Sequence, residues 1–157
     1  MAHIRTLAAL LTLFSTSFAY AEGSMVPPVK NTLVEKECGT CHMAFQPAFL
    51  TARSWQTIMD DLSNHFGDDA SLAPDKTKII REYLMSNAGD VTQSRSTRKY
   101  MQWSPTSDTP QRITENPAFL RKHSRFMEKV KTNPRIVTIS NCPACHTAAQ
   151  KGWYDDD

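Results

Sequence analysis

Residues 54–67 alternate between apolar and polar positions with the period of a helix. Ser54 is a suitable N-cap and Gly67 a suitable C-terminal stop, so the pattern predicts one amphipathic helix between them. His65 follows Leu62 by three residues and therefore falls on the apolar face of this helix. The other members of that face are Trp55, Ile58, Met59 and Phe66.

A second stretch of the same kind starts at Asn116 and Pro117, which suit an N-cap and a first helical residue. Asn133 and Pro134 close it. His123 again falls on the apolar face, which is formed by Phe119, Leu120, Phe126, Met127 and Val130. A histidine on such a face is more often a hydrogen-bonded core residue than a metal ligand, so both positions need further support before they indicate a site.

Three further helices complete the predicted fold. One covers the stretch TLVEKECGTCH at residues 32–42, one starts near Pro74 and ends before Gly89, and one covers roughly residues 135–145. The buried face of the helix after Pro74 is predicted to hold Ile79, Ile80, Tyr83 and Leu84. No stretch of convincing length alternates with the period of a strand, so the predicted fold class is all-α.

The N-terminus has the pattern of an exported protein. Residues 1–21 combine a basic start, an apolar run and the sequence Ala19-Tyr20-Ala21, which predicts a cleaved secretory signal peptide and a periplasmic location. The apolar run is too short for a comfortable membrane span.

Two small domains are expected after the signal peptide. Residues 22–95 form the N-terminal domain, which opens on an exposed arm at residues 22–32, and residues 96–157 form the C-terminal domain. The polar stretch at residues 90–115 is expected to link them, although Tyr100, Met101 and Trp103 in it could pack on a cofactor edge.

Charge is spread unevenly along the chain. Residues 22–90 hold 10 acidic and 6 basic side chains, net −4, whereas residues 91–157 hold 11 basic and 6 acidic, net +5. This asymmetry indicates docking faces for charged partners, although a solvated surface alone could produce it. An exported chain with a total charge near zero gives little support to a nucleic-acid role.

All four cysteines lie in two copies of the pattern Cys-x-x-Cys-His. The two copies are Cys38, Cys41 and His42, and Cys142, Cys145 and His146. Disulfides or a zinc site would also use such cysteines, but neither needs a histidine after the second cysteine. C-type haem attachment does, because the two thiols form thioethers with the macrocycle and the next imidazole binds the iron. The motifs therefore predict two covalently bound haems c.

Each iron then needs a sixth ligand or has an open site, and His65 and His123 are the remaining histidines after the signal peptide. Each lies 23 residues from its nearer motif. We predict bis-histidine ligation, His42 with His65 and His123 with His146, while pairing across the domains stays open. Methionine is the competing ligand. The candidates are Met59, Met85, Met101 and Met127, of which Met59 and Met127 fit apolar helix faces.

Several stretches make the chain similar to the dihaem cytochrome c family, whose type member is the electron-transfer partner of the sphaeroides haem protein. The similarity rests on CGTCHMAFQPAFL, W-x-x-I-M-x-x-L-x-x-HFGDDASL, II-x-x-YL and SNCPACHTAAQKGWYDDD. The resemblance implies two haem-centred helical domains, the first similar to class I cytochromes c, and makes His65 and His123 distal ligands. Ala73 departs from the aspartate expected before Pro74, which affects only that helix start.

The resemblance also implies a function. We expect a soluble electron carrier, not an enzyme, between a membrane cytochrome b or quinol-linked donor and a soluble haem-protein acceptor, and we expect it to be a monomer. The alternative is a small dihaem enzyme or gas-binding protein, peroxidase-like, with one open iron site, although the chain offers no extra acid–base candidates. A third interpretation is a zinc-binding or disulfide-bonded module without haem. Because each half is small and has few apolar residues, we expect the chain to be largely unfolded without haem.

Overall fold

The computed structural model describes residues 25–92, 94–104 and 109–154 of the 157-residue chain. The predicted signal peptide at residues 1–21 and the last three residues of the tail lie outside these ranges. Within them the chain forms α-helices and 3-10 turns, and its only extended pairings are two isolated bridges. The all-α prediction is therefore confirmed. No helix of the described part is long and apolar enough to cross a bilayer.

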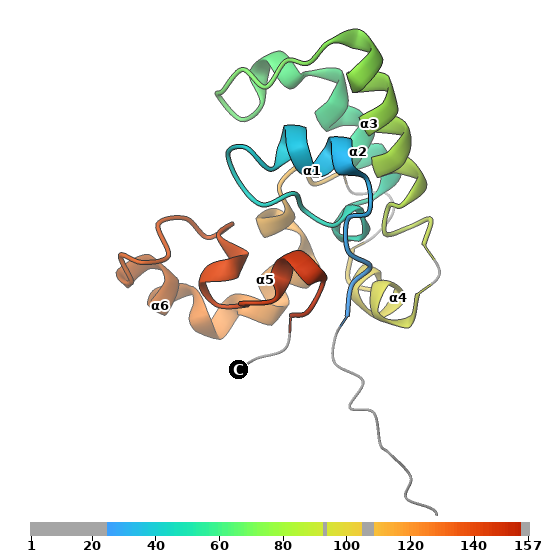
Figure 1. Ribbon diagram of the computed structural model, residues 1–157. Coiled ribbons are helices and arrows are strands. Elements are labelled where there is room, and N and C mark those ends of the chain that lie inside the picture. Colours follow the sequence, from blue (N-terminus) through green and yellow to red (C-terminus); the bar gives the residue numbers. More distant parts are fainter. Residues whose placement is uncertain (1–24, 93, 105–108, 155–157) are drawn as a thin grey trace, which may run out of the picture.

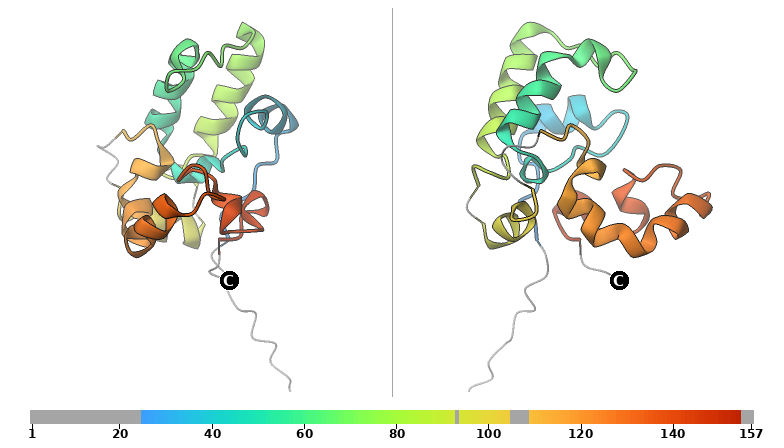
Figure 2. Two further views of the ribbon diagram at one scale, coloured as in Figure 1. Left: turned by 90° about the vertical axis from the view of Figure 1, so that its left-hand side faces the viewer. Right: turned by 180° about the vertical axis from the view of Figure 1, so that it is seen from behind.

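Helices α1, α2 and α3 form the upper body in Figure 1, and α4, α5 and α6 lie below them. Figure 2 shows the same two tiers from the side and from behind. The α-helices are α1 Thr32–Cys38, α2 Ala52–Asp60, α3 Pro74–Ser86, α4 Arg95–Met101, α5 Pro117–His123 and α6 Met127–Thr132. The 3-10 turns are Pro47–Phe49, Leu62–Asn64, Ile113–Glu115, Ser124–Phe126, Cys142–Ala144 and Ala149–Lys151.

The main apolar core lies between α2 and α3. Trp55, Ile58 and Met59 of α2 and Ile80 and Leu84 of α3 are all buried there. The prediction that Ile79 is also buried is wrong, because this residue is 48% exposed. One residue turns the side chain about 100° around the helix axis, so Ile79 faces solvent when Ile80 faces α2.

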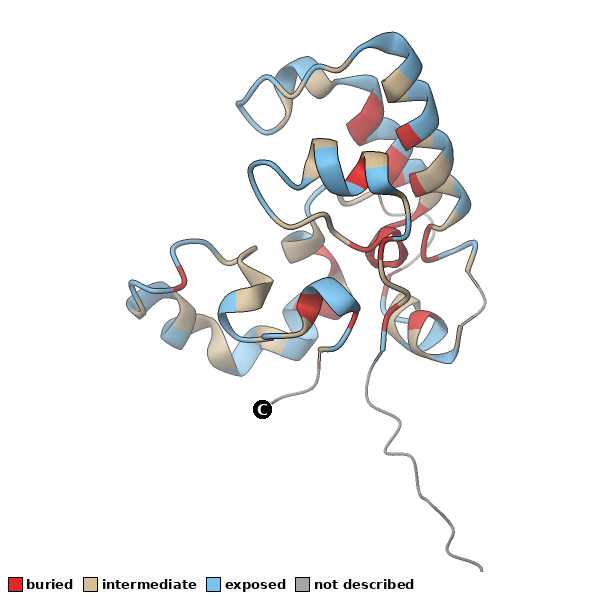
Figure 3. Cartoon of the chain, viewed as in Figure 1, coloured by how far each residue is buried: buried red, intermediate tan, exposed pale blue. Residues whose placement is uncertain are grey.

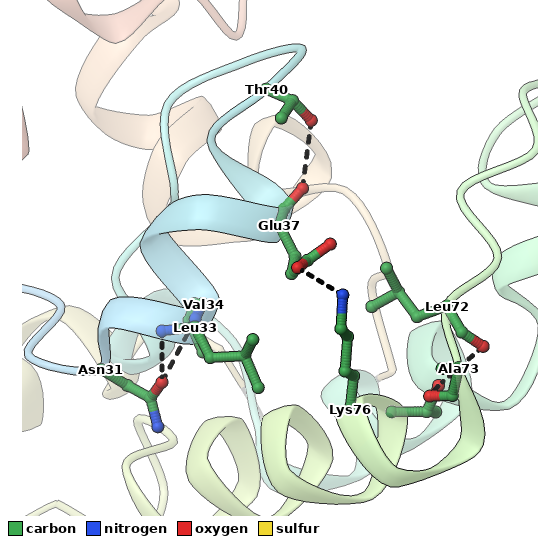
Figure 4. A network of polar contacts seen from close by, with 9 residues as sticks. Asn31, Leu33, Val34, Glu37, Thr40, Leu72, Ala73 and Lys76 are labelled. Carbon is green, nitrogen blue, oxygen red and sulfur yellow. Dashed lines mark hydrogen bonds and ion pairs between the residues drawn. The ribbon is translucent and has the colours of Figure 1, made fainter.

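Polar contacts hold α1 at both ends (Figure 4). The Asn31 side chain caps its start by accepting hydrogen bonds from two backbone N–H groups of the first turn, at 3.0 and 3.2 Å. At the other end, Lys76 Nζ of α3 donates to Glu37 Oε1 at 2.9 Å, and Thr40 Oγ1 donates to the Glu37 carbonyl at 3.1 Å. These contacts fix the helix whose last residue is Cys38.

The predicted helix over residues 54–67 is shorter and starts earlier. Its N-cap is Thr51 rather than Ser54, because the Thr51 side chain accepts from the Ser54 N–H at 3.1 Å. The helix ends at Asp60, and the next side chain, Asp61, accepts a local hydrogen bond from Ser63 Oγ at 3.0 Å. Such local bonds compete with helical ones and favour a turn at this point.

The second predicted histidine helix is divided into α5 and α6. Asn116 is its N-cap as predicted, since its Oδ1 accepts from the Ala118 N–H at 2.8 Å. The helix ends at His123, a 3-10 turn intervenes, and α6 stops at Thr132, as the Asn133-Pro134 signal predicted.

One other element prediction is wrong. The helix expected at residues 135–145 is absent from the described chain, which has only the short turn Cys142–Ala144 there. Val137 interrupts this region with a left-handed φ of 61°, which no helix accommodates. The polar stretch predicted as a linker contains helix α4, which Ser94 caps by accepting from the Thr97 N–H at 3.1 Å.

The N-terminal segment, Met25–Val29, was predicted to be an exposed arm, yet Val26 is 7% exposed. The Val26 N–H donates to the Gly152 carbonyl at 2.8 Å, and Met25 pairs with Trp153 in an isolated bridge. On its other side, Ser96 Oγ of α4 donates to the Met25 carbonyl at 2.6 Å. The segment therefore runs between α4 and the C-terminal tail, as Figures 1 and 2 show.

Candidate metal centres

The structure brings the rings of His42 and His65 together. Their centres are 6.2 Å apart, and their planes differ by 22°. His42 Nδ1 bonds to the carbonyl of Met43 at 2.7 Å, and because a carbonyl only accepts, Nδ1 carries the proton and Nε2 keeps a lone pair for a metal. Phe45 stacks on the same ring at 4.9 Å and fixes its plane.

His65 lies in a tight turn and not, as predicted, on the face of a helix. Its N–H donates to the Asp68 carbonyl at 2.7 Å, and the next residue, Phe66, has a left-handed φ of 60°. Burial, followed by the charges of His42 and Arg112, lowers the pKa of His65, and Asp68 opposes this in part. A lowered pKa keeps the imidazole neutral near pH 7, which is the form that binds metals.

His123 and His146 form a second pair. Their ring centres are also 6.2 Å apart, but their planes are nearly perpendicular, at 89°. His123 Nδ1 donates to the Phe119 carbonyl at 2.9 Å, and its ring stacks on Phe119 at 4.0 Å. The ring of His146 meets Tyr154 edge-on at 5.5 Å. The histidines thus pair within each half of the chain rather than across the halves.

Each pair of cysteines lies within one turn of a motif histidine. Cys38 ends α1, and the carbonyl of Cys142 accepts from the His146 N–H at 2.8 Å. The four cysteines form no disulfide; Cys41 and Cys145 are exposed and the other two half-buried. Burial raises the pKa of Cys38, and it raises the pKa of Cys142 to about 11. Before haem is attached, both are therefore neutral thiols near pH 7.

The spacing of each histidine pair fits an iron ion between the rings. An imidazole nitrogen binds a first-row metal at about 2 Å, and adding about 1 Å from nitrogen to ring centre on both sides gives about 6 Å. In the described ranges no group of three or more His, Cys, Asp or Glu side chains could hold a metal. Two protein ligands are too few for structural zinc, but they suffice when a macrocycle supplies the equatorial donors.

A buried tyrosine supports the same assignment. The Tyr100 hydroxyl is buried and has no hydrogen-bond partner among the described residues. Burial, with a further contribution from nearby Cys142, raises its pKa. A buried donor without a protein partner is rare, and a bound non-protein group is one of the explanations for it. The donor sets and this hydroxyl both fit haem.

Comparison with known proteins agrees with this chemistry. The family model described as dihaem cytochrome c matches residues 34–154. The chain belongs to the dihaem cytochrome c family. This cytochrome is 42% identical to the dihaem cytochrome c from Rhodobacter sphaeroides, whose structure covers 82% of this chain and 99% of its own with a TM-score of 0.66.

A dihaem cytochrome c from Shewanella baltica is similar as well. It is 38% identical, the match covers 80% of this chain and 87% of that one, and the TM-score is 0.64. No curated protein matches the chain. Family membership makes this cytochrome an electron-transfer haem protein with two covalently bound haems c, as the motifs predicted.

Two residues near the centres were not predicted from the sequence. Arg112 places its guanidinium 4.1 Å from the centre of the Phe66 ring, beside His65. Gln46 is fully buried and contacts the segment after His146. Neither role could be predicted locally, because a single polar residue does not reveal its long-range partners.

Proposed function

We propose that this cytochrome is a periplasmic electron carrier in which both irons are ligated by two histidines. The observation that supports this best is the pair of imidazole couples with ring centres 6.2 Å apart. When bound, each haem supplies an iron that takes up and releases one electron. The proposed iron ligands are His42 with His65 and His123 with His146; the proposed attachment residues are Cys38, Cys41, Cys142 and Cys145.

The surrounding residues hold the imidazoles for this role. The hydrogen bonds from Nδ1 of His42 and of His123 to backbone carbonyls fix the tautomer and make Nε2 more basic. More basic ligands favour the oxidised iron, so both potentials are expected to be lower than in His/Met cytochromes. With two imidazoles to hold each iron, neither centre would keep a position for a substrate, so the role we propose is that of a carrier rather than an enzyme.

The proposed partners are a membrane cytochrome b or quinol-linked donor and a soluble haem-protein acceptor. Support comes from the family resemblance and from charge, since residues 109–154 hold eight basic and two acidic side chains. Opposite charge on a partner would steer it to this half of a monomeric carrier. The signal-peptide pattern at residues 1–21 supports the periplasmic location.

The His65→Ala and His123→Ala variants test the ligand assignment. Each should lose the low-spin signature at one centre only and should bind carbon monoxide when reduced, because an axial position opens. The two centres can be distinguished by electron paramagnetic resonance, because the signal of a low-spin ferric haem depends on the angle between its imidazole planes, here 22° and 89°.

Methionine variants are the matched control. Met59→Leu and Met127→Leu should leave both low-spin signals intact, since these residues are assigned to packing. Low-spin character that survives at both centres in both histidine variants would contradict the proposal. Rapid binding of carbon monoxide by the reduced wild-type protein at neutral pH would instead favour an open-site enzyme or gas-binding protein.

A further inference from the structure

A buried glutamine connects the two parts of the chain that carry the candidate centres. Gln46 follows His42 by four residues in sequence, and none of its surface is exposed. Its Nε2 donates to the Ala149 carbonyl at 2.8 Å, and its Oε1 accepts from the Tyr154 hydroxyl. The Gln46 side chain, which follows the first motif, thus binds both Ala149 and Tyr154 in the segment that follows the second motif.

Ala149 and Tyr154 both contact His146. The Ala149 N–H donates to the His146 carbonyl at 2.9 Å. The ring of Tyr154 packs edge-on between His146, at 5.5 Å, and Phe49, at 5.1 Å. The position of the His146 imidazole therefore depends on Tyr154, and the position of Tyr154 depends on Gln46.

Gln46 is tied just as closely to the first centre. The preceding residue, Phe45, stacks on the His42 ring at 4.9 Å. The turn that follows, Pro47–Phe49, accepts a hydrogen bond at 2.7 Å from Trp55 Nε1 in the main core. The backbone on both sides of Gln46 is therefore fixed, and its side chain reaches toward the second centre from a rigid base.

Because Gln46 is buried, its two hydrogen bonds favour one relative placement of the two halves of the chain. A buried polar group that loses its partner costs about 1–3 kcal/mol. Gln46 satisfies a carbonyl with its amide N–H and a hydroxyl with its amide oxygen, and no apolar side chain of similar size can do either. The two hydrogen bonds therefore favour one relative placement of the two halves over any placement that separates them.

We propose that Gln46 and Tyr154 are positioning residues that fix the imidazole of His146 relative to that of His42. This inference rests on the proposed function, because it treats His146 as the proximal ligand of the second iron. The orientation of an axial imidazole and its surrounding contacts influence the electronic structure of the iron. The Gln46–Tyr154 hydrogen bond thereby sets the ligand geometry and the reduction potential of the second centre.

The test uses the haem-loaded full-length protein and three variants. Tyr154→Phe keeps the ring and removes only the hydroxyl, and Gln46→Leu removes both hydrogen bonds. Tyr83→Phe is the matched control, because the Tyr83 hydroxyl accepts from the Lys30 N–H at 2.8 Å and takes no part in these contacts. Electron paramagnetic resonance and a potentiometric titration report the signal and the potential of each centre.

We expect the signal and the potential of the second centre to shift in Tyr154→Phe, to shift further in Gln46→Leu, and to stay unchanged in Tyr83→Phe. The first centre should stay as in the wild type in all three. If Gln46→Leu does not fold, Tyr154→Phe decides alone. A second centre unchanged in Tyr154→Phe, or equal shifts at both centres, would overturn the inference. Failure of the proposed function would be visible separately, as the lack of two bis-histidine low-spin signals in the wild type.

Discussion

His65 depends on a neighbour with an unfavourable backbone conformation. Phe66 has a φ of 60°, and the left-handed region costs a non-glycine residue about 1–2 kcal/mol. Contact with the Arg112 guanidinium at 4.1 Å compensates part of this cost, since a cation–π contact contributes about 0.5–1 kcal/mol at an exposed site. Arg112 Nε also pairs with Glu115 at 3.5 Å, which holds the guanidinium in place.

Removal of this charge should lower the reduction potential of the first centre. A cation favours the reduced state, in which the iron carries one positive charge less, so Arg112→Gln should make reduction harder. Spectroelectrochemical titration of the haem-loaded protein measures the change. Arg121→Gln is the control, because Arg121 lies 4.0 Å from the Trp103 ring in a similar contact and belongs to α5, the helix that ends at His123. An unchanged first potential, or the same fall in both variants, would contradict this role.

The residue types of the candidate centres could be predicted from sequence, but their surroundings could not. Cys-x-x-Cys-His fixes the identity of three residues by itself, because thioether attachment and iron ligation need neighbouring side chains. His65 was predicted on a helix face, whereas it lies in a turn, since the local hydrogen bonds of Asp61 end α2 early. Gln46 acts through partners more than 100 residues away, which no local pattern encodes.

At the scale of elements, the start of α5 joins the two halves of the chain. Asn116 is 1% exposed, and its Nδ2 donates to the Phe49 carbonyl at 3.1 Å. Its Oδ1 caps the helix at the Ala118 N–H and also accepts from the Ser104 hydroxyl. A helix cap thus doubles as a contact between the halves.

Asn116→Ala should destabilise the protein by about 2–4 kcal/mol, because a lost cap costs about 1 kcal/mol and an unsatisfied buried carbonyl about 1–3 kcal/mol. Asn31→Ala is the control, since Asn31 caps α1 without the long-range contact and should cost only about 1 kcal/mol. Denaturant unfolding of the haem-loaded variants, followed by circular dichroism, measures both. Equal losses would show that the Phe49 contact contributes nothing.

Helices with strong end signals were predicted well, and those without were not. Pro74 starts α3 and Asn116-Pro117 starts α5, as expected from the fixed φ of proline. Helix α4 was missed because its sequence RSTRKYM is mostly polar, and its buried residue is Thr97. Its place is set by tertiary contacts, such as the edge-on packing of Tyr100 on Phe49 at 5.3 Å.

Over the whole molecule, burial is concentrated in the upper body (Figure 3). Helix α6 has no buried residue. The buried apolar residues between positions 109 and 154 are Ala118, Phe119, Ile136 and Ala149. So small a set offsets little of the entropy lost on ordering that segment, so the second half needs a further apolar body. A covalently bound haem provides one.

Loss of the second haem should therefore unfold the second half of the chain while the first half stays folded. In the Cys142→Ala/Cys145→Ala double variant, we expect amide hydrogen exchange to lose protection over residues 109–154. Protection in α2 and α3 should persist, because all the buried residues of their core lie between positions 29 and 88. The Cys38→Ala/Cys41→Ala double variant, which removes the proposed attachment residues of the first haem, serves as the comparison. Full protection of residues 109–154 without the second haem would disprove this dependence.

The charge of the second half should control how quickly partners associate. Lys122→Glu/Lys129→Glu reverses two exposed charges there, and the association rate with an acidic redox partner should fall about tenfold or more at low salt. The rates of variant and wild type should converge as salt screens the charges. Lys36→Glu/Lys78→Glu makes the same change on exposed positions of the first half and should have little effect. Unaltered kinetics and salt dependence in the first variant would exclude this docking face.

The domain boundary predicted at residues 95 and 96 remains a prediction. The two halves are in contact, since Met25 and Val26 pair with Trp153 and Gly152, and Met25 also accepts a hydrogen bond from Ser96 of α4. Pairing between distant parts of a chain leaves no local sequence pattern, which is why Met25–Val29 was taken for an exposed arm.

That pairing also bears on how the chain folds. Gly152 has a φ of 84°, and a Cβ there would lie 1.9 Å from the Val26 carbonyl oxygen, so only glycine lets the two ends of the described chain meet. Contacts between residues so far apart in sequence are the costliest to close and form late. We therefore expect this contact between the two ends to be among the last to form when the chain folds.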